Sequence, residues 1–455
     1  MQLAGRKALV AGMARTGVAA ARFLTGRGAL VTVSEARPEK ELGGVAAELR
    51  ARGIEIECGG NRVESFLAAD FIVLSPGVPL NIPPLQKARE RKIEILSELE
   101  LAWRFLRGTT VAVTGSNGKT TTTALLGRIF QKAGRPTQVG GNIGTPLVSL
   151  VDTATDDTVN VVEASSFQLE AVTSFAPKVG ALLNLTPDHL DRHASMGEYI
   201  AAKAKLFGQQ GADDFAIFNA DDPAVVALEP EVRAQRFWFS RKRRLDVGSF
   251  LEDDWIVFAN GPEREKVLER SAIRLKGRHN LENVLAAVCA ARLLGVPAEA
   301  VRAGISEFEG VEHRLEFVAE IDGVSYFNDS KATNVDSALK AIEAFYQKLV
   351  VILGGKDKGG DFAPLGEPLR QRARRTLLIG AASKKIAAQL EGAVEFEMLE
   401  TLPPAVARAA EIAEPGDVVL LAPACASFDQ FESFEHRGRC FKEEVRRRVS
   451  IRQEN

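Results

Sequence analysis

Short apolar runs alternate with amphipathic helical stretches along the chain. The apolar runs have the length and content of buried parallel strands, and most of them end in Gly, Pro, Asn or Asp. The predicted strands lie at 7–12, 30–35, 70–77, 110–115, 158–165, 178–185, 214–221, 324–329, 348–355, 375–380 and 417–424. Such alternation is typical of doubly wound sheets, so the predicted fold class is α/β.

The pattern also predicts where the chain divides. A helix-like stretch at 85–106 leads from the first group of strands into the second, and 310–314 is a second hinge candidate. Short β pieces are expected at 237–275, followed by a strong helix at 280–295. We therefore predict three α/β domains, at 1–97, 98–310 and 311–455.

Composition excludes several classes of protein. Lys and Arg total 58 against 60 for Asp and Glu, so no broad basic surface for nucleic acid is expected. No stretch approaches the ~20 apolar residues of a membrane span. The four cysteines form no CxxC pair, which argues against thiolate metal sites and disulfides. We expect a cytoplasmic protein that binds neither nucleic acid nor a membrane.

The segment TGSNGKTTT, at 114–122, predicts a phosphate-binding loop between a strand and a helix. Backbone N–H groups at a helix N-terminus attract an anion, and Lys119 adds a point charge for the outer phosphates. The hydroxyl of Thr120 or Thr121 would reach Mg²⁺. Compared with the usual G-x-x-x-x-G-K-[ST] pattern, this loop is two residues shorter between its glycines.

Polar residues at the following strand ends extend this candidate site. Glu163 ends a buried strand, where a carboxylate suits Mg²⁺. His189 would be either a metal ligand or a structural residue. Lys203 lies on the helical side of Ile200 and Phe207, so its ammonium group either reaches past them to solvent or has a function.

Loops elsewhere suggest two further ligands. The turn at 12–17 lacks the middle glycine of a dinucleotide fingerprint, which disfavours a nicotinamide cofactor but still allows a diphosphate. Arg37 could reach a phosphate, and the 74–79 loop contains two prolines that would stiffen it around a ligand. In the last third, the loops at 327–334, 354–360 and 423–434 carry groups suited to a small dicarboxylate or amino acid.

Taken in order, these motifs resemble the Mur ligase family of peptidoglycan synthesis. The resemblance covers essentially the whole chain and includes GMARTG, LSPGVP, TGSNGKTT, GGNIGTP, EASSFQLE, NLTPDHLDRH, GRHNLEN, NDSKATN and SFDQFESFEHRG. The last two motifs point to the branch that adds D-glutamate. The family fold would be an N-terminal Rossmann-like UDP-binding domain, a central P-loop-type ATPase domain and a C-terminal Rossmann-like domain.

The resemblance also implies a reaction. ATP would phosphorylate the carboxylate of UDP-N-acetylmuramoyl-L-alanine, and the amine of D-glutamate would then attack the acyl phosphate. Domain closure would exclude water from this intermediate. A monomer is expected.

Roles for individual residues follow from the same resemblance. Lys119 would grip the phosphates, Thr120 and Glu163 would hold one Mg²⁺, and His189 would hold a second. Lys203 matches the family lysine that CO₂ carbamylates, which would make it a Mg²⁺ ligand too. The nucleotide would contact Gly115, Ser116, Asn117, Gly118, Lys119, Thr120, Thr121, Asn283, Arg314 and Asp329, and Arg314 would also be catalytic.

Two groups of residues match the family's substrate positions. Thr16, Arg37 and Ser75 match positions for the uridine diphosphate, and Asn142 would meet the same substrate. The positions that match the D-glutamate site are Lys331, Thr333, Lys358, Ser427 and Phe434. Ala36 departs from the family, because a threonine hydroxyl often stands there.

Parts of the sequence also fit three other functions. A folylpolyglutamate synthase shares the short phosphate loop but lacks a nucleotide-sugar domain before it. An NAD-dependent oxidoreductase is suggested only by the first ~95 residues. A non-catalytic nucleotide-binding regulator would not need the full set of candidate catalytic residues.

Overall fold

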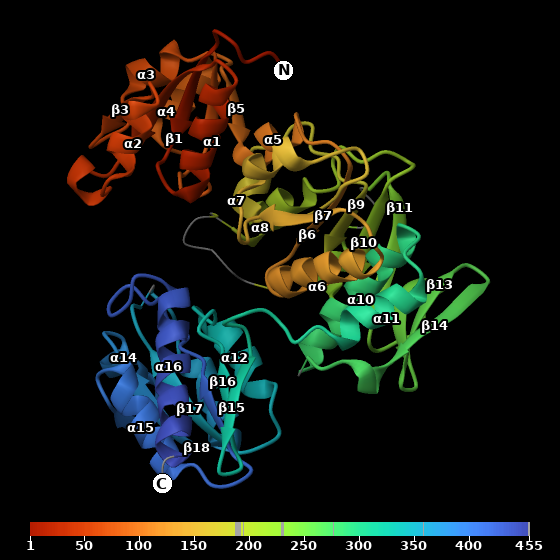
Figure 1. Cartoon of the computed structure of the whole chain (residues 1–455), viewed down its shortest axis with the longest axis vertical. Helices are drawn as coiled ribbons and strands as arrows, with labels where there is room; N and C mark the ends of the chain where they lie inside the picture. Colours follow the sequence, from red (N-terminus) through yellow and green to blue (C-terminus); the bar gives the residue numbers. More distant parts are fainter. Residues whose placement is uncertain (187–192, 194, 229–231, 276, 358, 454–455) are drawn as a thin grey trace. The chain divides into compact units, whose positions relative to one another are not determined.

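The computed structural model describes residues 1–186, 193, 195–228, 232–275, 277–357 and 359–453 (Figure 1). These residues form two compact units, Met1–Ala272 with Glu282–Ser306 and Ile273–Leu281 with Glu307–Asn455. Within the described residues there are three sheets, of five, nine and six strands. The predicted three-domain α/β fold is confirmed, whereas its predicted boundaries stay predictions.

The first sheet is parallel, with strand order β3-β2-β1-β4-β5. Its strands are β1 (Lys7–Ala11), β2 (Leu30–Glu35), β3 (Glu55–Cys58), β4 (Phe71–Leu74) and β5 (Glu94–Ser97). Helices α1 (Arg15–Gly26), α2 (Val45–Ala51), α3 (Val63–Ala68) and α4 (Pro83–Glu90) connect them (Figure 1). Every residue of β4 is buried, as expected of a central strand covered on both faces.

The predicted helix-like stretch at 85–106 is wrong, because strand β5 interrupts it. Helix α4 ends at Glu90, Lys92 has a φ of 58°, and the edge strand β5 pairs with β4. Ser97 then caps helix α5 (Glu98–Trp103), since its side chain accepts a hydrogen bond from the Glu100 N–H. Strand β5 has only four residues and lies between two helical patterns, so the hydrophobic periodicity is too short there to indicate a strand.

The second sheet has the order β14-β13-β12-β11-β10-β9-β6-β8-β7, and only its β13 and β14 pairings are antiparallel. Its first strands are β6 (Thr109–Thr114), β7 (Thr137–Gly141), β8 (Val159–Glu163), β9 (Val179–Leu182) and β10 (Phe215–Asn219). The expected short β pieces are β11 (Gln235–Ser240), β12 (Val247–Glu252), β13 (Trp255–Asn260) and β14 (Glu263–Glu269).

Helices of this part include α6 (Lys119–Lys132), α7 (Ser166–Leu169), α8 (Met196–Ala204), α9 (Pro223–Val226), α10 (Arg278–Leu293) and α11 (Ala298–Ser306). Helix α10 is the strong helix predicted at 280–295, and it starts two residues earlier than predicted. Helix α6 contacts α11 and the strands beside it. This packing fixes the N-terminus of α6, and with it the phosphate loop, at the end of β6.

The third sheet has the order β15-β16-β20-β17-β18-β19, with one antiparallel edge strand, β15. Its strands are β15 (Glu316–Ile321), β16 (Val324–Asn328), β17 (Leu349–Gly354), β18 (Ala373–Ile379), β19 (Phe396–Met398) and β20 (Val418–Leu421). The flanking helices are α12 (Val335–Glu343), α13 (Gly366–Arg372), α14 (Ser383–Leu390), α15 (Leu402–Ile412) and α16 (Phe434–Gln453) (Figure 1). Among the described residues, no helix is long and apolar enough to cross a membrane.

Candidate active site

The predicted phosphate loop connects β6 to α6. Gly115 and Gly118 have φ angles of 151° and 85°, which turn the backbone sharply before the helix begins. Lys119 donates hydrogen bonds to the carbonyl oxygens of Gly115 and Ser116, at 2.9 and 2.8 Å. Its ammonium group thus lies over the loop.

The neighbouring strand end holds this loop in position. The backbone N–H of Ser116 donates to the Asn184 carbonyl at 2.9 Å, and that of Asn117 donates to Asn184 Oδ1 at 2.8 Å. The Ser116 hydroxyl donates to the Thr186 carbonyl and lies 2.9 Å from the Tyr199 hydroxyl. Ser116 and Asn117 therefore shape the loop through their side chains and backbone.

Asn283, on α10, lies against the loop. It is 3% exposed, and a Cβ atom added to Gly118 would stand 2.1 Å from its Oδ1. Any side chain at position 118 would therefore displace Asn283. The left-handed backbone at this position favours glycine as well.

Glu163 presents one carboxylate oxygen that is buried and unsatisfied. Asn142 donates to its Oε1 at 2.6 Å, and the side chain is 2% exposed. Among the residues that the structure describes, Oε2 has no hydrogen-bond partner. A buried carboxylate oxygen to which no described residue donates suits a hard cation such as Mg²⁺, and Thr120 is buried at the start of α6, the helix that contacts β8. The donor set therefore fits the metal that the family implies.

Lys203 is buried on α8 with 1% exposure. Its ammonium group donates to the Gly115 carbonyl at 2.8 Å and lies 4.6 Å from the centre of the Tyr199 ring. The prediction that it points to the apolar side is confirmed, and it reaches the phosphate loop. Ser195 caps the helix by accepting from the Glu198 N–H at 3.2 Å. His189 lies outside the described residues.

The first sheet brings the predicted diphosphate residues toward one turn. Gly12 and Gly17 face Ser75 so closely that a Cβ on Gly17 would lie 2.0 Å from the Gly12 carbonyl oxygen. Ser75 donates to that carbonyl at 3.1 Å. Thr16 is half-buried in the first turn of α1.

Arg37 has a partner that the sequence reasoning missed. It donates two hydrogen bonds of 3.0 Å to the buried carboxylate of Glu35. Burial alone would raise the pKa of Glu35, but hydrogen bonds from Arg37 and from the Met13 N–H lower it below its usual value. Glu35 thus holds the half-exposed guanidinium of Arg37 beside the glycine turn.

In the third sheet, the predicted amino-acid residues lie in loops after β16 and β20. The Asn334 side chain caps α12 by accepting from the Ser337 N–H. Helix capping therefore does not account for Asp329, Lys331 and Thr333 in the same loop. The Lys331 ammonium group lies 5.7 Å from the centre of the Phe434 ring. Ser427 is buried in the loop after β20. Lys358 lies outside the described residues.

Asp329 and Arg314 lie near each other in the second unit. Asp329 is buried and accepts from the Leu315 N–H at 3.2 Å. Burial raises its pKa to about 6, although the charge of Arg314, that hydrogen bond and the charge of Lys331 act in the opposite direction. That both residues contact the nucleotide stays a prediction.

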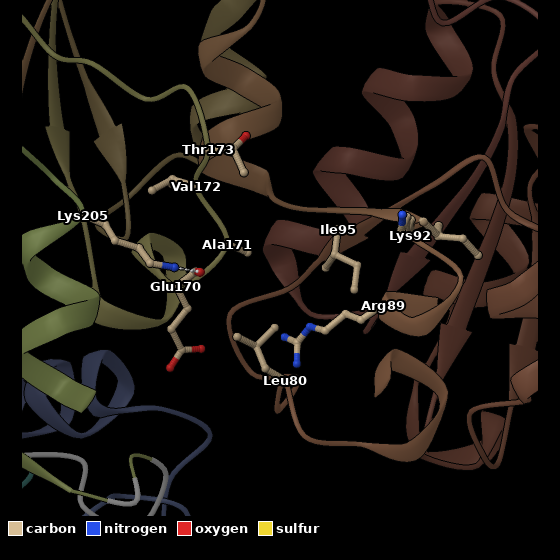
Figure 2. A pocket seen from close by; sticks show the side chains of 10 residues that line it. Leu80, Arg89, Lys92, Ile95, Glu170, Ala171, Val172, Thr173 and Lys205 are labelled. Atoms are coloured by element: carbon tan, nitrogen blue, oxygen red, sulfur yellow. Dashed lines mark hydrogen bonds between the residues drawn. The ribbon is translucent and has the colours of Figure 1, made fainter. Parts of the chain in front are cut away.

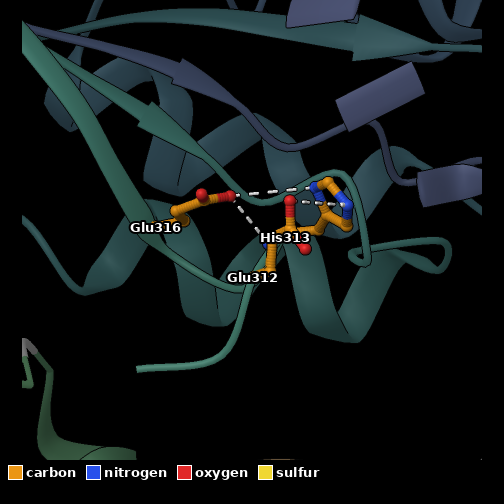
Figure 3. A group of neighbouring side chains, drawn as sticks. All are labelled: Glu312, His313 and Glu316. Carbon is orange, nitrogen blue, oxygen red and sulfur yellow. Dashed lines mark hydrogen bonds and ion pairs between the residues drawn. The ribbon is translucent and has the colours of Figure 1, made fainter. Parts of the chain in front are cut away.

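The segment around Arg314 is a strained turn that ion pairs hold in place. His313 and Leu315 have φ angles of 64° and 43°. Figure 3 shows Glu312, His313 and Glu316, whose ligand atoms lie within 4.8 Å of one another. The Lys442 ammonium group donates to both carboxylates, at 2.5 and 2.9 Å. Because a lysine occupies the place where a metal would bind, this group is an ion-pair cluster.

An open cavity of about 400 Å³ lies in the first unit, lined by Leu80, Arg89, Ile95, Glu170 and Lys205 among others (Figure 2). Burial lowers the pKa of Lys205, partly offset by Glu170. None of the predicted site residues is among the residues that line this cavity. It is therefore separate from the candidate site, which lies at the ends of β6 and β8.

Family models match three successive parts of the chain. The Mur ligase MurD-like N-terminal domain matches residues 6–97, the Mur ligase middle domain matches 113–291, and the Mur ligase glutamate ligase domain matches 313–425. A UDP-N-acetylmuramoylalanine--D-glutamate ligase of Acidobacterium capsulatum is 52% identical over 447 residues, covering 98% of this chain and 97% of that protein. The chain belongs to the Mur ligase family. A protein of the same name from Solibacter usitatus is 50% identical, covering 98% of each.

Solved structures of other Mur ligases share the fold. UDP-N-acetylmuramate-alanine ligase MurC of Thermotoga maritima matches with a TM-score of 0.60 at 21% identity, covering 97% of this chain and 99% of that one. A pseudomurein peptide ligase type C from Methanothermus fervidus gives the same TM-score at 19% identity, covering 97% and 100%. At these identities the likeness concerns the fold alone.

Proposed function

We propose that this Mur ligase joins D-glutamate to UDP-N-acetylmuramoyl-L-alanine, with hydrolysis of ATP to ADP and phosphate. The observation that carries the proposal is the cluster formed by the phosphate loop, Glu163 and Lys203 at the ends of β6 and β8. The full-length relatives that bear this activity in their name give the substrates.

A carboxylate is a poor electrophile, so the reaction needs a leaving group on the L-alanyl carboxylate. Transfer of the γ-phosphoryl group of ATP would supply it, and the D-glutamate amine would then displace phosphate to leave a peptide bond. Charge accumulates on phosphoryl oxygens during both steps, so catalysis consists largely of positioning and cationic stabilisation. Lys119 and the N–H groups at the start of α6 would supply that stabilisation.

Thr120 and Glu163 would hold Mg²⁺, which would neutralise phosphate charge when bound. His189 and Lys203 would hold a second ion, with Lys203 carbamylated. Two observations support carbamylation. Lys203 is buried, and its ammonium group shares the Gly115 carbonyl oxygen with that of Lys119, so two like charges lie close together. Conversion of one cation to a carbamate removes that repulsion.

The remaining contacts divide between the two substrates. Thr16, Arg37 and Ser75 would bind the uridine diphosphate, and Asn142 would meet the same substrate. Lys331, Thr333, Ser427 and Phe434, with Lys358, would bind D-glutamate. Asn283, Arg314 and Asp329 would complete the nucleotide site. A cytoplasmic monomer is part of the proposal.

The test is an ADP-release assay with UDP-N-acetylmuramoyl-L-alanine and one amino acid at a time. D-Glutamate should support turnover, whereas L-lysine, diaminopimelate and L-alanine should not. Turnover with L-glutamate and a folate in place of these substrates would indicate a folylpolyglutamate synthase. Turnover with another amino acid alone would assign the chain to a different Mur ligase.

A further inference from the structure

Arg437 is an arginine buried in the first turn of α16. It is 1% exposed and is among the largest fully buried side chains of the described chain. The sequence gives little sign of this burial, because α16 is rich in charged residues and has the composition of a surface helix. A buried guanidinium group requires hydrogen-bond acceptors for its five N–H groups.

These acceptors come from two loops far apart in the sequence. Arg437 Nε donates to Ser330 Oγ at 2.9 Å, and one terminal nitrogen donates to the Ser330 carbonyl at 2.8 Å. Further bonds of 3.1 to 3.3 Å go to the carbonyl oxygens of Cys425 and Ala426. The guanidinium group thus connects the loop after β16 to the loop after β20.

A third loop packs against the same group. A Cβ atom on Gly355, in the loop after β17, would lie 3.1 Å from a terminal nitrogen of Arg437. Lys356 and Ala426 exchange two backbone hydrogen bonds, of 2.8 and 3.1 Å, which join this loop to the one after β20. These are the three loops that carry the proposed amino-acid contacts, with Lys331 and Ser427 each adjacent in sequence to a residue that Arg437 holds.

Within the described part of the chain, no ion pair neutralises the charge of Arg437. Among the described residues, its hydrogen bonds go to a serine hydroxyl and to backbone carbonyls, and no carboxylate lies within ion-pair distance. Burial lowers the pKa of Arg437 to about 10, with Cys425 and Asp429 acting in the opposite direction, so it remains a cation at neutral pH. An uncompensated buried cation favours an anion nearby, because the low-dielectric interior screens its field weakly.

We propose that Arg437 is a positioning residue for the acceptor amino acid. Its guanidinium group fixes the three loops relative to one another, and its positive charge favours a dicarboxylic amino acid over a neutral one. This inference rests on the proposed function, because it assigns a role in the proposed D-glutamate site.

The test uses the full chain with Arg437→Lys and Arg437→Met, and with Arg447→Met as the matched control. Arg447 lies on the same helix, is exposed, and pairs with Glu444 at 2.8 Å. KM is measured for D-glutamate, for ATP and for the nucleotide-sugar substrate. Arg437→Lys keeps the charge but loses most of the hydrogen bonds that the planar guanidinium group makes. Its KM for D-glutamate should therefore rise about tenfold, as expected for the loss of one charge-assisted hydrogen bond. Arg437→Met should raise that KM further, while the other two KM values change less than about twofold.

A purely structural role would give a different result. Equal changes in all three KM values, or an unchanged D-glutamate KM in folded Arg437→Lys, would overturn the inference. If the Arg437 variants do not fold, Ser330→Ala replaces them, because it removes the acceptor of the Nε bond and keeps the bond to the Ser330 carbonyl, although it also removes the 2.8 Å bond that this hydroxyl donates to the Phe434 carbonyl. It should raise the D-glutamate KM about threefold at an unchanged thermal midpoint, and no rise would count against the inference.

The wild-type assay separates this inference from the proposed function. If the unmodified chain releases no ADP in response to D-glutamate, the proposed function fails, and the role of Arg437 fails with it. If the wild type uses D-glutamate and Ser427→Ala weakens its binding, but the Arg437 variants do not, only the Arg437 inference fails.

Discussion

Asn142 Nδ2 donates a 2.6 Å hydrogen bond to Glu163 Oε1, where the paired strands β7 and β8 end. This bond fixes the carboxylate and leaves Oε2, within the described chain, without a partner. Loss of a residue that orients a metal ligand typically lowers metal affinity or activity strongly.

Glu163→Gln should therefore abolish most of the Mg²⁺-dependent activity, and Asn142→Ala should weaken the apparent affinity for Mg²⁺ about 10- to 100-fold. The measurement is a Mg²⁺ titration of ADP release. Gln138→Ala is the control, because Gln138 lies on β7, just before Asn142, but donates to the Thr153 hydroxyl. An unchanged Mg²⁺ dependence in Glu163→Gln would remove this residue from the metal site.

Lys203→Ala should lose most activity and regain part of it when a short carboxylic acid is supplied. The alanine leaves a gap beside Gly115 that formate or acetate fills with the carboxylate that a carbamate would provide. Lys205→Ala, two residues away and outside the candidate site, serves as the control and should remain active without added acid. Full activity of Lys203→Ala in the absence of acid would refute the carbamate role.

Gly118→Ala should weaken ATP binding at least tenfold. The new Cβ would stand 2.1 Å from Asn283 Oδ1, and the left-handed backbone at this position adds strain of about 1–3 kcal/mol. Calorimetric titration with ATP gives the dissociation constant. Gly26→Ala is the matched control, since its Cβ would meet nothing within 4 Å. Equal ATP affinity in the two variants would argue against a nucleotide contact at this loop.

Sequence patterns predicted the parts of the fold that depend on local composition. Strand β17 is apolar throughout and fully buried, and the residues of the phosphate loop are contiguous, so both could be read directly. Lys203 was placed on the apolar side because helical spacing fixes direction within one turn of a helix.

What could not be predicted depends on distant partners. Arg437 contacts Ser330, more than 100 positions away, and nothing local distinguishes it from its charged neighbours on α16. Arg37 was expected near a phosphate, but its pairing with Glu35 depends on how the turn after β2 folds back. Strand β5 was missed because its pairing with β4, rather than its own pattern, stabilises it.

Glu98 leads to a prediction on stability. It begins α5 with 1% exposure, accepts from the Val148 N–H at 2.7 Å, and has a second oxygen for which the described residues provide no hydrogen bond. Burial raises the pKa of Glu98 from 4.5 to about 7, against the effect of the Val148 and Leu147 N–H groups and of the Gln168 side chain. The folded protein therefore binds this proton more tightly than the unfolded chain.

The sign of the effect follows from this difference. Stability is lost as the pH rises from 4.5 to about 7 and stays lower above that, by about 3 kcal/mol. Glu98→Gln has no proton to lose, so its unfolding free energy relative to wild type should increase by about this amount between pH 4.5 and pH 8. Urea unfolding of both proteins at the two pH values measures the change. Glu90→Gln, at an exposed position of α4, is the control, and its unfolding free energy should differ from that of the wild type by the same amount at both pH values. The same result for Glu98→Gln would show that Glu98 ionises in the folded protein without loss of stability.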